Sequence, residues 1–356
     1  MNKKIGILTF HYPENRNFGA MLQSYAVLKM VENENENAKL INFIPVKKFT
    51  LQSQIMFKYL GRGFSEFSNN FLKNTVKIKT FKELKSLNME FSTFLVGSDQ
   101  VWRPLWLKEY LPHYYFDFVN DDKKKIAYAA SFGVDFWEGS DSQTKQIKEL
   151  AQRFDYVSTR EESGIDICKE QFEVEATCVL DPTMMIDRKD YQSILDDYTC
   201  VKHKKSKYIA HMLLDDSDEL IRGSNDIANY LSAKIIKIKG KPIKIFKKNL
   251  FKYNKVSQWL KYLEDADLVV TDSFHCTVFS ILFKKKFIVV ANPTRGIARL
   301  RNLLIKLKLE DRFFTNINEV IGSKILDRDV DYTIVENELE KYREKSFQFL
   351  KNALGN

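Results

Sequence analysis

The stretch LVVTDSFHCTVFSILF, residues 268–283, decides the fold because it joins a short apolar strand directly to an apolar helix. Its first three residues have the composition of a buried strand, Asp272 or Ser273 can cap the next element, and the apolar run that follows has helix length. His275 then lies in the first helical turn, where unpaired backbone N–H groups and the helix dipole attract phosphate or carboxylate. We expect an anionic ligand and a proton on His275 to bind together.

Outward from this stretch, strand-like runs alternate with helical stretches along the whole chain. The first series is KIGILTF, KLINFI, FLVGSD, KIAYAASFG, FDYVST and CVLDPT, and the second is KYIAHML, KIIKIKG, DLVVTD and KFIVVANP. This alternation predicts an α/β protein with two Rossmann-like domains and a cleft between them. We expect a first domain over residues 1–185 with a basic helical insertion at about 47–90, a second over 186–335, and a helix over 336–356 that packs back across the domains.

Composition narrows the class of protein without choosing a partner. The 356 residues are 44% hydrophobic, enough for two cores, and 56 Lys and Arg against 47 Asp and Glu give a formal net charge of +9. This excess fits either an ordinary basic surface or attraction to an anionic partner. Cys168, Cys178, Cys200 and Cys276 lack the spacing of zinc ligands or a disulfide framework, so we expect a reducing cytoplasm and no metal. No apolar stretch reaches the roughly 20 residues of a spanning helix.

Polar residues follow two strands of the first series, where open α/β sheets bind ligands. In NFGAMLQ, Asn17 can cap a helix, and Gln23 is a second polar group; the motif fits a ligand site and a capped surface helix equally. In VGSDQVWRP, Asp99 could act as an acid or base and Trp102 could stack on a sugar, although Trp102 also fits a core anchor. The later LDPT motif indicates a hinge.

Arginines follow two further strands. In TREESG, Arg160 takes the first helical position and could clamp an anion in bidentate fashion, or form a surface ion pair with a neighbouring glutamate. Because Arg160 and His275 occupy corresponding strand ends in the two halves, they could face each other across the cleft. Arg295 or Arg299, beyond the next strand, could supply the second charge that a doubly anionic substrate requires.

Six motifs together resemble the polysaccharide pyruvyl transferase family over roughly residues 4–304: NFGAMLQSYAVL, VGSDQVW, YAASFG, VSTREESG, VLDPT and TDSFHCTVFSILF. The resemblance implies a two-domain GT-B fold and transfer of pyruvate from phosphoenolpyruvate to a sugar of a surface polysaccharide or its lipid-linked precursor. The product would be a ketal, with release of phosphate. The expected partners are phosphoenolpyruvate and a saccharide acceptor, not nucleic acid, with no further cofactor. We expect a cytoplasmic enzyme, with peripheral association at the inner face of the membrane.

The resemblance also implies roles for individual residues. Arg160 would bind phosphoenolpyruvate together with Ser273 and Phe274, and His275 would contact the same substrate and donate a proton. Ser273 stands where some members have arginine, so Arg295 or Arg299 would complete the phosphate clamp. The acceptor would be bound by the polar residues of the first domain, which are Asn17, Gln23, Asp99, Gln100 and Trp102.

Two other functions share parts of this pattern. A GT-B glycosyltransferase that uses a nucleotide sugar needs the same two domains and also binds phosphate at a helix N-terminus. A basic, non-enzymatic scaffold that binds anionic lipid-linked glycans would keep its full effect without His275.

Overall fold

A parallel sheet of six strands forms the first domain. The computed structural model describes residues 4–34, 37–44, 59–198, 206–215, 217–245, 248–292 and 297–355. The strand order is β2-β1-β3-β4-β5-β6, and every neighbouring pair is parallel. The strands are β1 (Lys4–Leu8), β2 (Asn37–Leu40), β3 (Thr93–Val96), β4 (Lys124–Ala130), β5 (Tyr156–Thr159) and β6 (Thr177–Cys178). β3 is buried along its length, as expected of a strand covered by helices on both faces.

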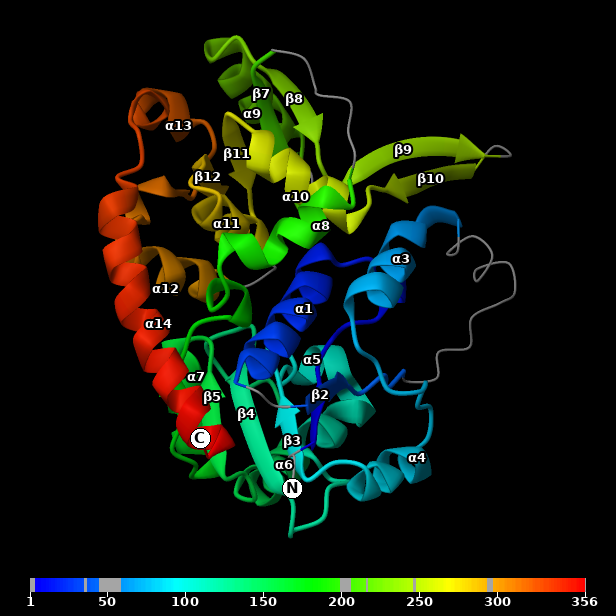
Figure 1. The fold of residues 1–356 in the computed structure, drawn as a ribbon. Coiled ribbons are helices and arrows are strands. Elements are labelled where there is room, and N and C mark those ends of the chain that lie inside the picture. The colour runs from blue at the N-terminus through cyan, green and yellow to red at the C-terminus, as the bar shows by residue number, and fades with distance from the viewer. Residues whose placement is uncertain are drawn as a thin grey trace.

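A second parallel sheet, in the order β13-β12-β11-β7-β8, forms the other domain (Figure 1). Its strands are β7 (Tyr208–Met212), β8 (Lys234–Lys237), β11 (Leu268–Thr271), β12 (Lys286–Val290) and β13 (Phe313–Phe314). In each sheet the chain first adds a strand on one side and then returns to the other. The resulting switch points lie between β1 and β3 and between β7 and β11, where doubly wound folds bind ligands at the carboxyl ends of the strands.

Helices cover both sheets and connect their strands. They are α1 (Phe18–Asn33), α3 (Arg62–Phe71), α4 (Phe81–Ser86), α5 (Pro104–Leu107), α6 (Asp141–Ala151), α7 (Glu162–Phe172), α8 (Gln192–Asp196), α9 (Asp218–Tyr230), α10 (Val256–Asp265), α11 (Phe274–Leu282), α12 (Ala298–Lys306), α13 (Glu319–Gly322) and α14 (Tyr332–Leu354). None of the helices in the described ranges combines the length and the apolar character that crossing a bilayer demands.

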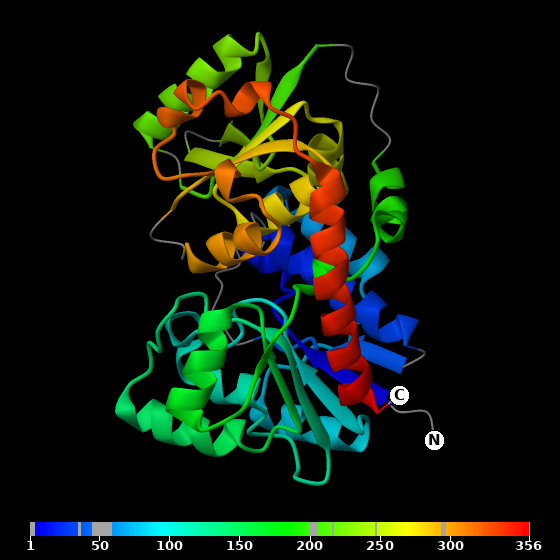
Figure 2. The ribbon, with the colours of Figure 1, turned by 90° about the vertical axis from the view of Figure 1, so that its left-hand side faces the viewer.

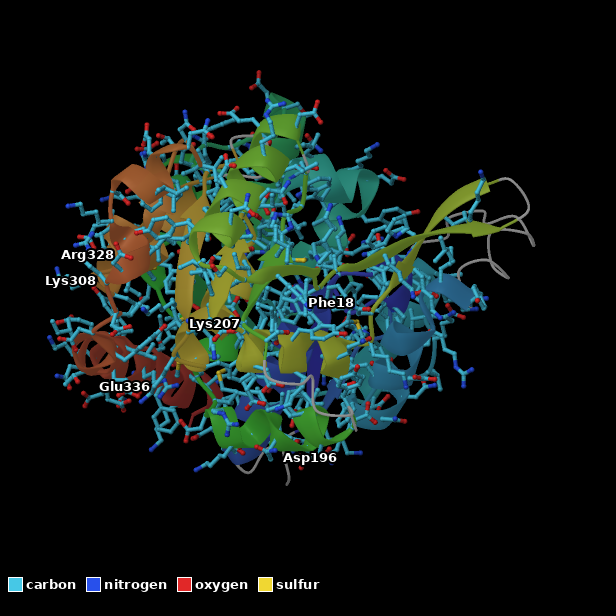
Figure 3. The ribbon with its side chains drawn as sticks, turned by 90° about the horizontal axis from the view of Figure 1, so that it is seen from above. Phe18, Asp196, Lys207, Lys308, Arg328 and Glu336 are labelled. Atoms are coloured by element: carbon cyan, nitrogen blue, oxygen red, sulfur yellow. The ribbon has the colours of Figure 1, made fainter. Side chains whose placement is uncertain are left out.

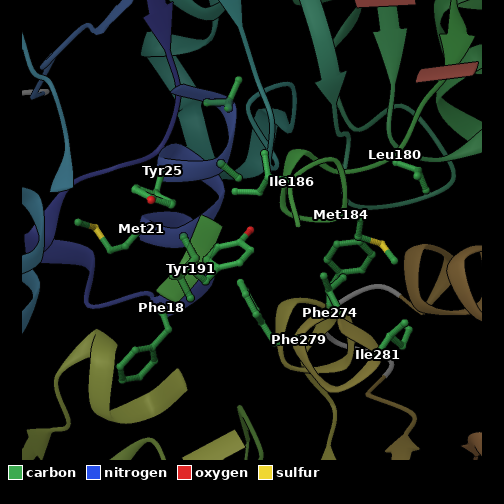
Figure 4. Packing of buried hydrophobic residues seen from close by; sticks show 14 of the residues in the cluster. Phe18, Met21, Tyr25, Leu180, Met184, Ile186, Tyr191, Phe274, Phe279 and Ile281 are labelled. Atoms are coloured by element: carbon green, nitrogen blue, oxygen red, sulfur yellow. The ribbon is translucent and has the colours of Figure 1, made fainter. Parts of the chain in front are cut away.

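Aromatic side chains join the two domains into one continuous core (Figure 4). Phe18 of α1 stacks on Trp259 of α10 with ring centroids 5.3 Å apart. Tyr191, in the linker between the sheets, lies 6.0 Å from Tyr25 of α1 and 5.1 Å from Phe279 of α11. Tyr191 thereby links α1 of the first domain to α11 of the second.

The C-terminal helix α14 runs along both domains (Figure 2). Near its start, the Tyr332 hydroxyl donates a hydrogen bond to Lys285 O in the second domain. Further along, the Ser346 hydroxyl accepts one from Leu180 N, and at its end Lys124 of β4 donates to Ala353 O. The helix begins a few residues before the predicted residue 336.

The predicted boundary at residue 185 falls in the linker between β6 and β7, which contains two 3₁₀ turns, Pro182–Met184 and Arg188–Tyr191. Of the predicted basic insertion, residues 47–58 lie outside the described residues, and the remainder holds the short helices α3 and α4.

One element differs from the prediction for the second domain. The segment KIIKIKG was predicted as a single strand, but β8 ends at Lys237 and a separate antiparallel hairpin follows, β9 (Gly240–Ile245) and β10 (Lys248–Tyr253). Gly240 has a φ of 143°, and a Cβ there would lie 2.2 Å from Lys252 O. Glycine is therefore required at the start of this hairpin.

Candidate functional site

Asp181, buried directly after β6, is the point at which polar side chains of both domains meet. Its Oδ2 accepts hydrogen bonds from Arg160 Nη1 at 2.7 Å and from Ser98 Oγ at 3.0 Å. Its Oδ1 accepts from the backbone N–H and the hydroxyl of Thr183 at 3.0 and 2.6 Å. From the second domain, His275 Nε2 lies 3.7 Å from the same Oδ2. The structure therefore brings Arg160 and His275 together at one carboxylate oxygen. We call the side chains gathered around Asp181 the cluster.

The charge of Asp181 is stabilised by its neighbours. Burial alone would raise the pKa of the Asp181 carboxyl, but His275, Arg160 and the Thr183 hydroxyl lower it, and the net result is a pKa well below the usual range. The carboxylate is therefore ionised at neutral pH. The LDPT motif had indicated only a hinge; the missed signal is that a buried aspartate needs a cation, which Arg160 supplies from 21 residues earlier.

Arg160 is itself buried, with 5% of its surface exposed. Burial lowers the pKa of the guanidinium, but Asp181, Asp99 and Glu161 more than reverse this, so its pKa lies above the usual value and it stays charged. Nη2 is 3.5 Å from Asp99 Oδ1. Neither Nε nor Nη2 finds a hydrogen-bond acceptor among the described residues. These two atoms form one edge of the guanidinium, and that edge can bind a carboxylate or phosphate in bidentate fashion.

The predicted position of Arg160 in its helix was wrong. The helix α7 begins at Glu162, with Glu161 as its N-cap residue, so Arg160 lies in the turn between β5 and α7. No capping box forms at this described helix start, because the Thr159 hydroxyl donates to Glu161 O and the Glu161 side chain makes no capping bond. Glu161 instead accepts hydrogen bonds from the Ser131 hydroxyl and from Phe132 N, both at 2.8 Å, which ties the Arg160 turn to the end of β4.

Phe274 brings a second arginine into the cluster. The Arg160 guanidinium carbon lies 4.5 Å from the centre of the Phe274 ring, and that of Arg299, near the start of α12, lies 5.8 Å from it. Burial, and then repulsion from Arg160, lower the pKa of Arg299 to about 10, with Glu161 and Asp99 acting in the opposite sense. Two buried cations that share one aromatic ring favour an anion between the domains.

His275 is the second residue of α11 and is held by close packing. Ser273 caps this helix as predicted, through Cys276 N. A Cβ on Gly19, in the first turn of α1, would lie only 2.1 Å from His275 Nδ1. His275 therefore fills the space that Gly19 leaves, and the positive ends of two helices, one from each domain, meet at this imidazole.

The loop after β3 places Asp99 beside Arg160 and fixes the residues next to it. Asp99 has a φ of 76°, an uncommon conformation for a residue other than glycine, and its carbonyl accepts from Val101 N and Ser131 N. Gln100 Oε1 accepts hydrogen bonds from Trp106 Nε1 at 2.9 Å and from Arg103 at 3.2 Å. Gln100, which was predicted to bind the acceptor, thus uses its side-chain oxygen to orient neighbouring side chains.

Two of the predicted acceptor-binding residues belong to the core instead. Trp102 is 1% exposed, stacks on Tyr115 at 4.7 Å and donates its indole N–H to Tyr114 O. No face of its ring is left for a sugar, so the acceptor role is corrected to that of a core anchor. Gln23 is fully buried, and its amide nitrogen bonds to Thr9 and neighbouring groups, which fixes α1 to the end of β1.

The remaining predicted residues are of two kinds. Asn17 is exposed, and its side chain caps α1 by accepting from Ala20 N at 3.2 Å. Arg295 lies outside the described residues, so Arg299 is the predicted second arginine that the structure places at the cluster. Within the described ranges, no group of three or more His, Cys, Asp or Glu is arranged to hold a metal ion.

Trp106 is an aromatic residue that the sequence analysis did not select. It is 50% exposed, although its indole N–H is bonded to Gln100 and the Arg103 guanidinium lies 5.2 Å from its ring centre. The ring is therefore both held in place and open to solvent, one loop away from Asp99.

The family to which the chain belongs is shown by comparison with known proteins. A family model described as polysaccharide pyruvyl transferase matches residues 17–294, most of the chain and all of the cluster up to His275. The chain belongs to the polysaccharide pyruvyl transferase family. It is therefore a transferase with a saccharide acceptor, which confirms the resemblance noted from the six motifs. No curated protein matches the chain in sequence.

Solved structures confirm the GT-B-like fold of this pyruvyl transferase. The S. aureus MnaA–UDP complex has a TM-score of 0.57 at 10% identity, covering 100% of this chain and 97% of that one. The UDP-GlcNAc 2-epimerase of Neisseria meningitidis, solved with UDP-GlcNAc, has a TM-score of 0.54 at 8% identity, with 99% of both chains covered. At these identities the likeness concerns the fold alone.

Proposed function

We propose that this transferase moves the pyruvyl group of phosphoenolpyruvate to a sugar of a surface polysaccharide or its lipid-linked precursor, forming a ketal and releasing phosphate. The observation that carries the proposal is the edge of Arg160 formed by Nε and Nη2. It is buried, charged and without a hydrogen-bond acceptor among the described residues, and Arg299 shares the Phe274 ring with it. Phosphoenolpyruvate carries two anionic groups, and two buried arginines can bind one each.

Entry of the donor requires movement. Arg160, Phe274 and His275 are each less than a tenth exposed, so phosphoenolpyruvate can reach them only if the domains part or side chains turn. Closure around the bound substrate would then exclude water, which would otherwise compete with the sugar hydroxyl and hydrolyse the enol ester.

The chemistry needs a proton at the methylene carbon. In the proposed first step His275 gives that proton to C3 of phosphoenolpyruvate, and a sugar hydroxyl oxygen bonds to C2 as its own proton leaves to Asp99. The result is a tetrahedral adduct that still bears phosphate. The C2–O bond to phosphate then breaks, a second hydroxyl of the same sugar bonds to C2, and its proton leaves with the phosphate. Asp99 returns its proton to His275, directly or through water, so that the residues are restored.

Asp181 has a positioning part in this proposal. Its carboxylate is 3.7 Å from His275 Nε2 and so places a fixed negative charge beside the proposed proton donor. The same carboxylate orients Arg160 through Nη1 and leaves the other edge of the guanidinium for the substrate. No cofactor other than the donor substrate is required by this scheme.

The acceptor would bind on the side of the first domain. Asp99 and Arg160 lie within 3.5 Å of each other, so an acceptor hydroxyl near Asp99 would also be near the donor. Trp106 replaces Trp102 as the residue proposed to stack on a sugar, because its ring is half exposed and its orientation is fixed by Gln100.

The test is incubation of the protein with phosphoenolpyruvate and a saccharide acceptor, with phosphate release and the ketal product as readouts. Arg160→Lys keeps the charge but loses the bidentate edge, so we expect a large rise in the KM for phosphoenolpyruvate. Arg222→Lys, on the exposed surface of α9, is the matched control and should leave both readouts unchanged. Release of nucleotide from a nucleotide sugar, without phosphate release from phosphoenolpyruvate, would instead establish the glycosyltransferase function. Full activity of His275→Asn would contradict the proposed proton donor.

A further inference from the structure

The hairpin β9–β10 carries an unusual concentration of positive charge. Residues 234–255 contain nine lysines and no aspartate, glutamate or arginine, so this short stretch matches the net charge of the whole chain. The hairpin projects from the body of the second domain, as the view from above shows (Figure 3). Lys241, Lys244 and Lys252 are exposed, and none of them forms an ion pair with another described residue.

The register of the hairpin places like charges opposite each other. Lys241 pairs directly with Lys252, and the next pair on the same face is Ile243 with Leu250. Like charges in directly opposed positions destabilise a two-stranded ribbon, which has little stability of its own. Lys252 Nζ lies 5.6 Å from the centre of the Tyr59 ring, but no described carboxylate pairs with either lysine, and this like-charge pair indicates an anionic partner.

The two faces of the hairpin have different surroundings. Tyr253, on one face, lies 5.9 Å from Phe64 and 6.5 Å from Phe18, ring centre to ring centre, and so anchors the base of the hairpin to the body. The opposite face carries the paired lysines and, beside them, the half-buried Ile243 and Leu250. That face combines cationic groups with apolar side chains.

We propose that the hairpin β9–β10 binds the anionic surface of a lipid bilayer. The lysines would lie at the headgroup phosphates, and Ile243 and Leu250 would lie at the boundary between headgroups and acyl chains. The biological role of this binding rests on the proposed function, because a bilayer-bound transferase would meet a lipid-linked acceptor at the same surface. The binding itself needs no catalysis and is tested without it.

A bilayer fits these residues better than a nucleic acid does. Specific contacts to nucleic acid favour arginine, whose planar group pairs with phosphates and base edges, and residues 234–255 contain only lysine. Lysine acts as a point charge, which suffices for a diffuse anionic surface, and its long apolar stem can lie along the headgroup region.

The experiment measures co-sedimentation of the full chain with vesicles of phosphatidylcholine alone and of phosphatidylcholine mixed with phosphatidylglycerol. We expect binding to the mixed vesicles only. Raising the ionic strength from about 0.01 M to about 1 M shortens the Debye length from about 30 Å to about 3 Å and should abolish it. Each surface lysine contributes roughly a fivefold factor at an anionic bilayer, so K241Q/K252Q, which removes the opposed pair beside Ile243 and Leu250, should weaken partitioning roughly 25-fold.

The matched control is K77Q/K82Q, which removes the same charge from exposed sites on the first domain. It should bind the mixed vesicles nearly as well as the unaltered protein, and both double variants should keep the ability to release phosphate with a water-soluble acceptor. The proposal is overturned if the unaltered protein does not sediment with mixed vesicles, or if both variants lose binding equally. Hairpin-dependent retention on DNA without vesicle binding would also overturn it. Vesicle binding by a protein that does not use phosphoenolpyruvate would contradict only the proposed function.

Discussion

On the first domain's side of the cluster, hydrogen bonds and ion pairs fix the side chains, whereas on the second domain's side they are fixed by packing. Arg160 and Asp181 are tied to each other, and Asp181 is tied in turn to Ser98 and Thr183. His275, in contrast, makes no hydrogen bond through Nε2 to any described residue, and it lies against Gly19. The first side should therefore be sensitive to loss of charge and the second to added volume.

Removal of the Asp181 charge should have the largest effect. Asp181→Asn leaves Arg160 buried without its main counter-charge, and breaking a buried pair in this way costs about 3–5 kcal/mol. We expect denaturant unfolding to show a loss of stability of that order, together with loss of pyruvyl transfer. Asp187→Asn, an exposed change a few residues along the chain, is the control and should alter neither. A stable Asp181→Asn protein would show that packing, not charge, fixes the first side as well.

His11, a buried histidine that follows β1, tests how strongly burial in the first domain opposes charge. Burial lowers the pKa of His11 from 6.5 to about 4, and the carbonyl of Thr9, 3.0 Å from Nδ1, offsets this only in part. Because the folded pKa is the lower one, the unfolded chain binds more protons between pH 6.5 and 4, and the free energy of unfolding falls as the pH is lowered through that window.

The loss from His11 should reach about 3 kcal/mol at full protonation. Denaturant unfolding of the unaltered protein and of His11→Gln, each followed from pH 7 to pH 4, isolates this contribution as the difference between the two slopes. Equal slopes would show that His11 gains a proton without cost and that the site around it is open to water.

Added volume at Gly19 should disturb the packed side. Gly19→Ala places a methyl group against His275 Nδ1 and Cγ, at 2.1 and 2.5 Å, so the imidazole or α1 must shift. Overpacking of this kind costs about 1–3 kcal/mol, and we expect a tenfold or greater fall in kcat for pyruvyl transfer. The matched helical glycine is Gly322, where a Cβ would meet nothing within 4 Å. Gly322→Ala should keep full activity, and a fully active Gly19→Ala protein would contradict the role assigned to packing.

The smallest effect is expected at Trp106, the residue proposed to stack on the acceptor sugar, which belongs to neither side of the cluster. Trp106→Ala removes the exposed ring and should raise the KM for the acceptor by roughly tenfold, about 1.4 kcal/mol, without changing the KM for phosphoenolpyruvate. Trp106→Phe should restore part of the affinity. Leu105→Ala, the exposed neighbour, serves as the control. A change in the KM for phosphoenolpyruvate alone would place Trp106 on the donor side.

Sequence periodicity was sufficient for the regular elements and for the choice of fold. The strands β7, β11 and β12 lie within the runs predicted for them, KYIAHML, DLVVTD and KFIVVANP, because each is a short apolar run. The hairpin was missed because alternating Ile and Lys residues predict a strand but do not show where one strand ends and the next begins. Gly240 marks the start of the hairpin, but its positive φ angle is visible only in the structure.

The cluster was predictable in its types of residue and less so in its contacts. Arg160 and His275 were found because charged residues at strand ends stand out in an apolar sequence. Asp181 was passed over because its partners are distant in the chain, so no local pattern shows that its carboxylate is buried. Trp102 and Trp106 lie four residues apart, and only the tertiary fold decides which of the two rings is covered.

The long helix α14 has a mechanical consequence for the entry of substrate. Its 23 residues extend about 35 Å at 1.5 Å per residue, and it is bonded to the second domain near one end and to the first domain near the other. Because the helix is stiff and attached to both domains, it keeps them at a fixed separation on its own side of the molecule. When the domains part to admit substrate, the movement should therefore be smallest beside α14 and largest on the side away from it.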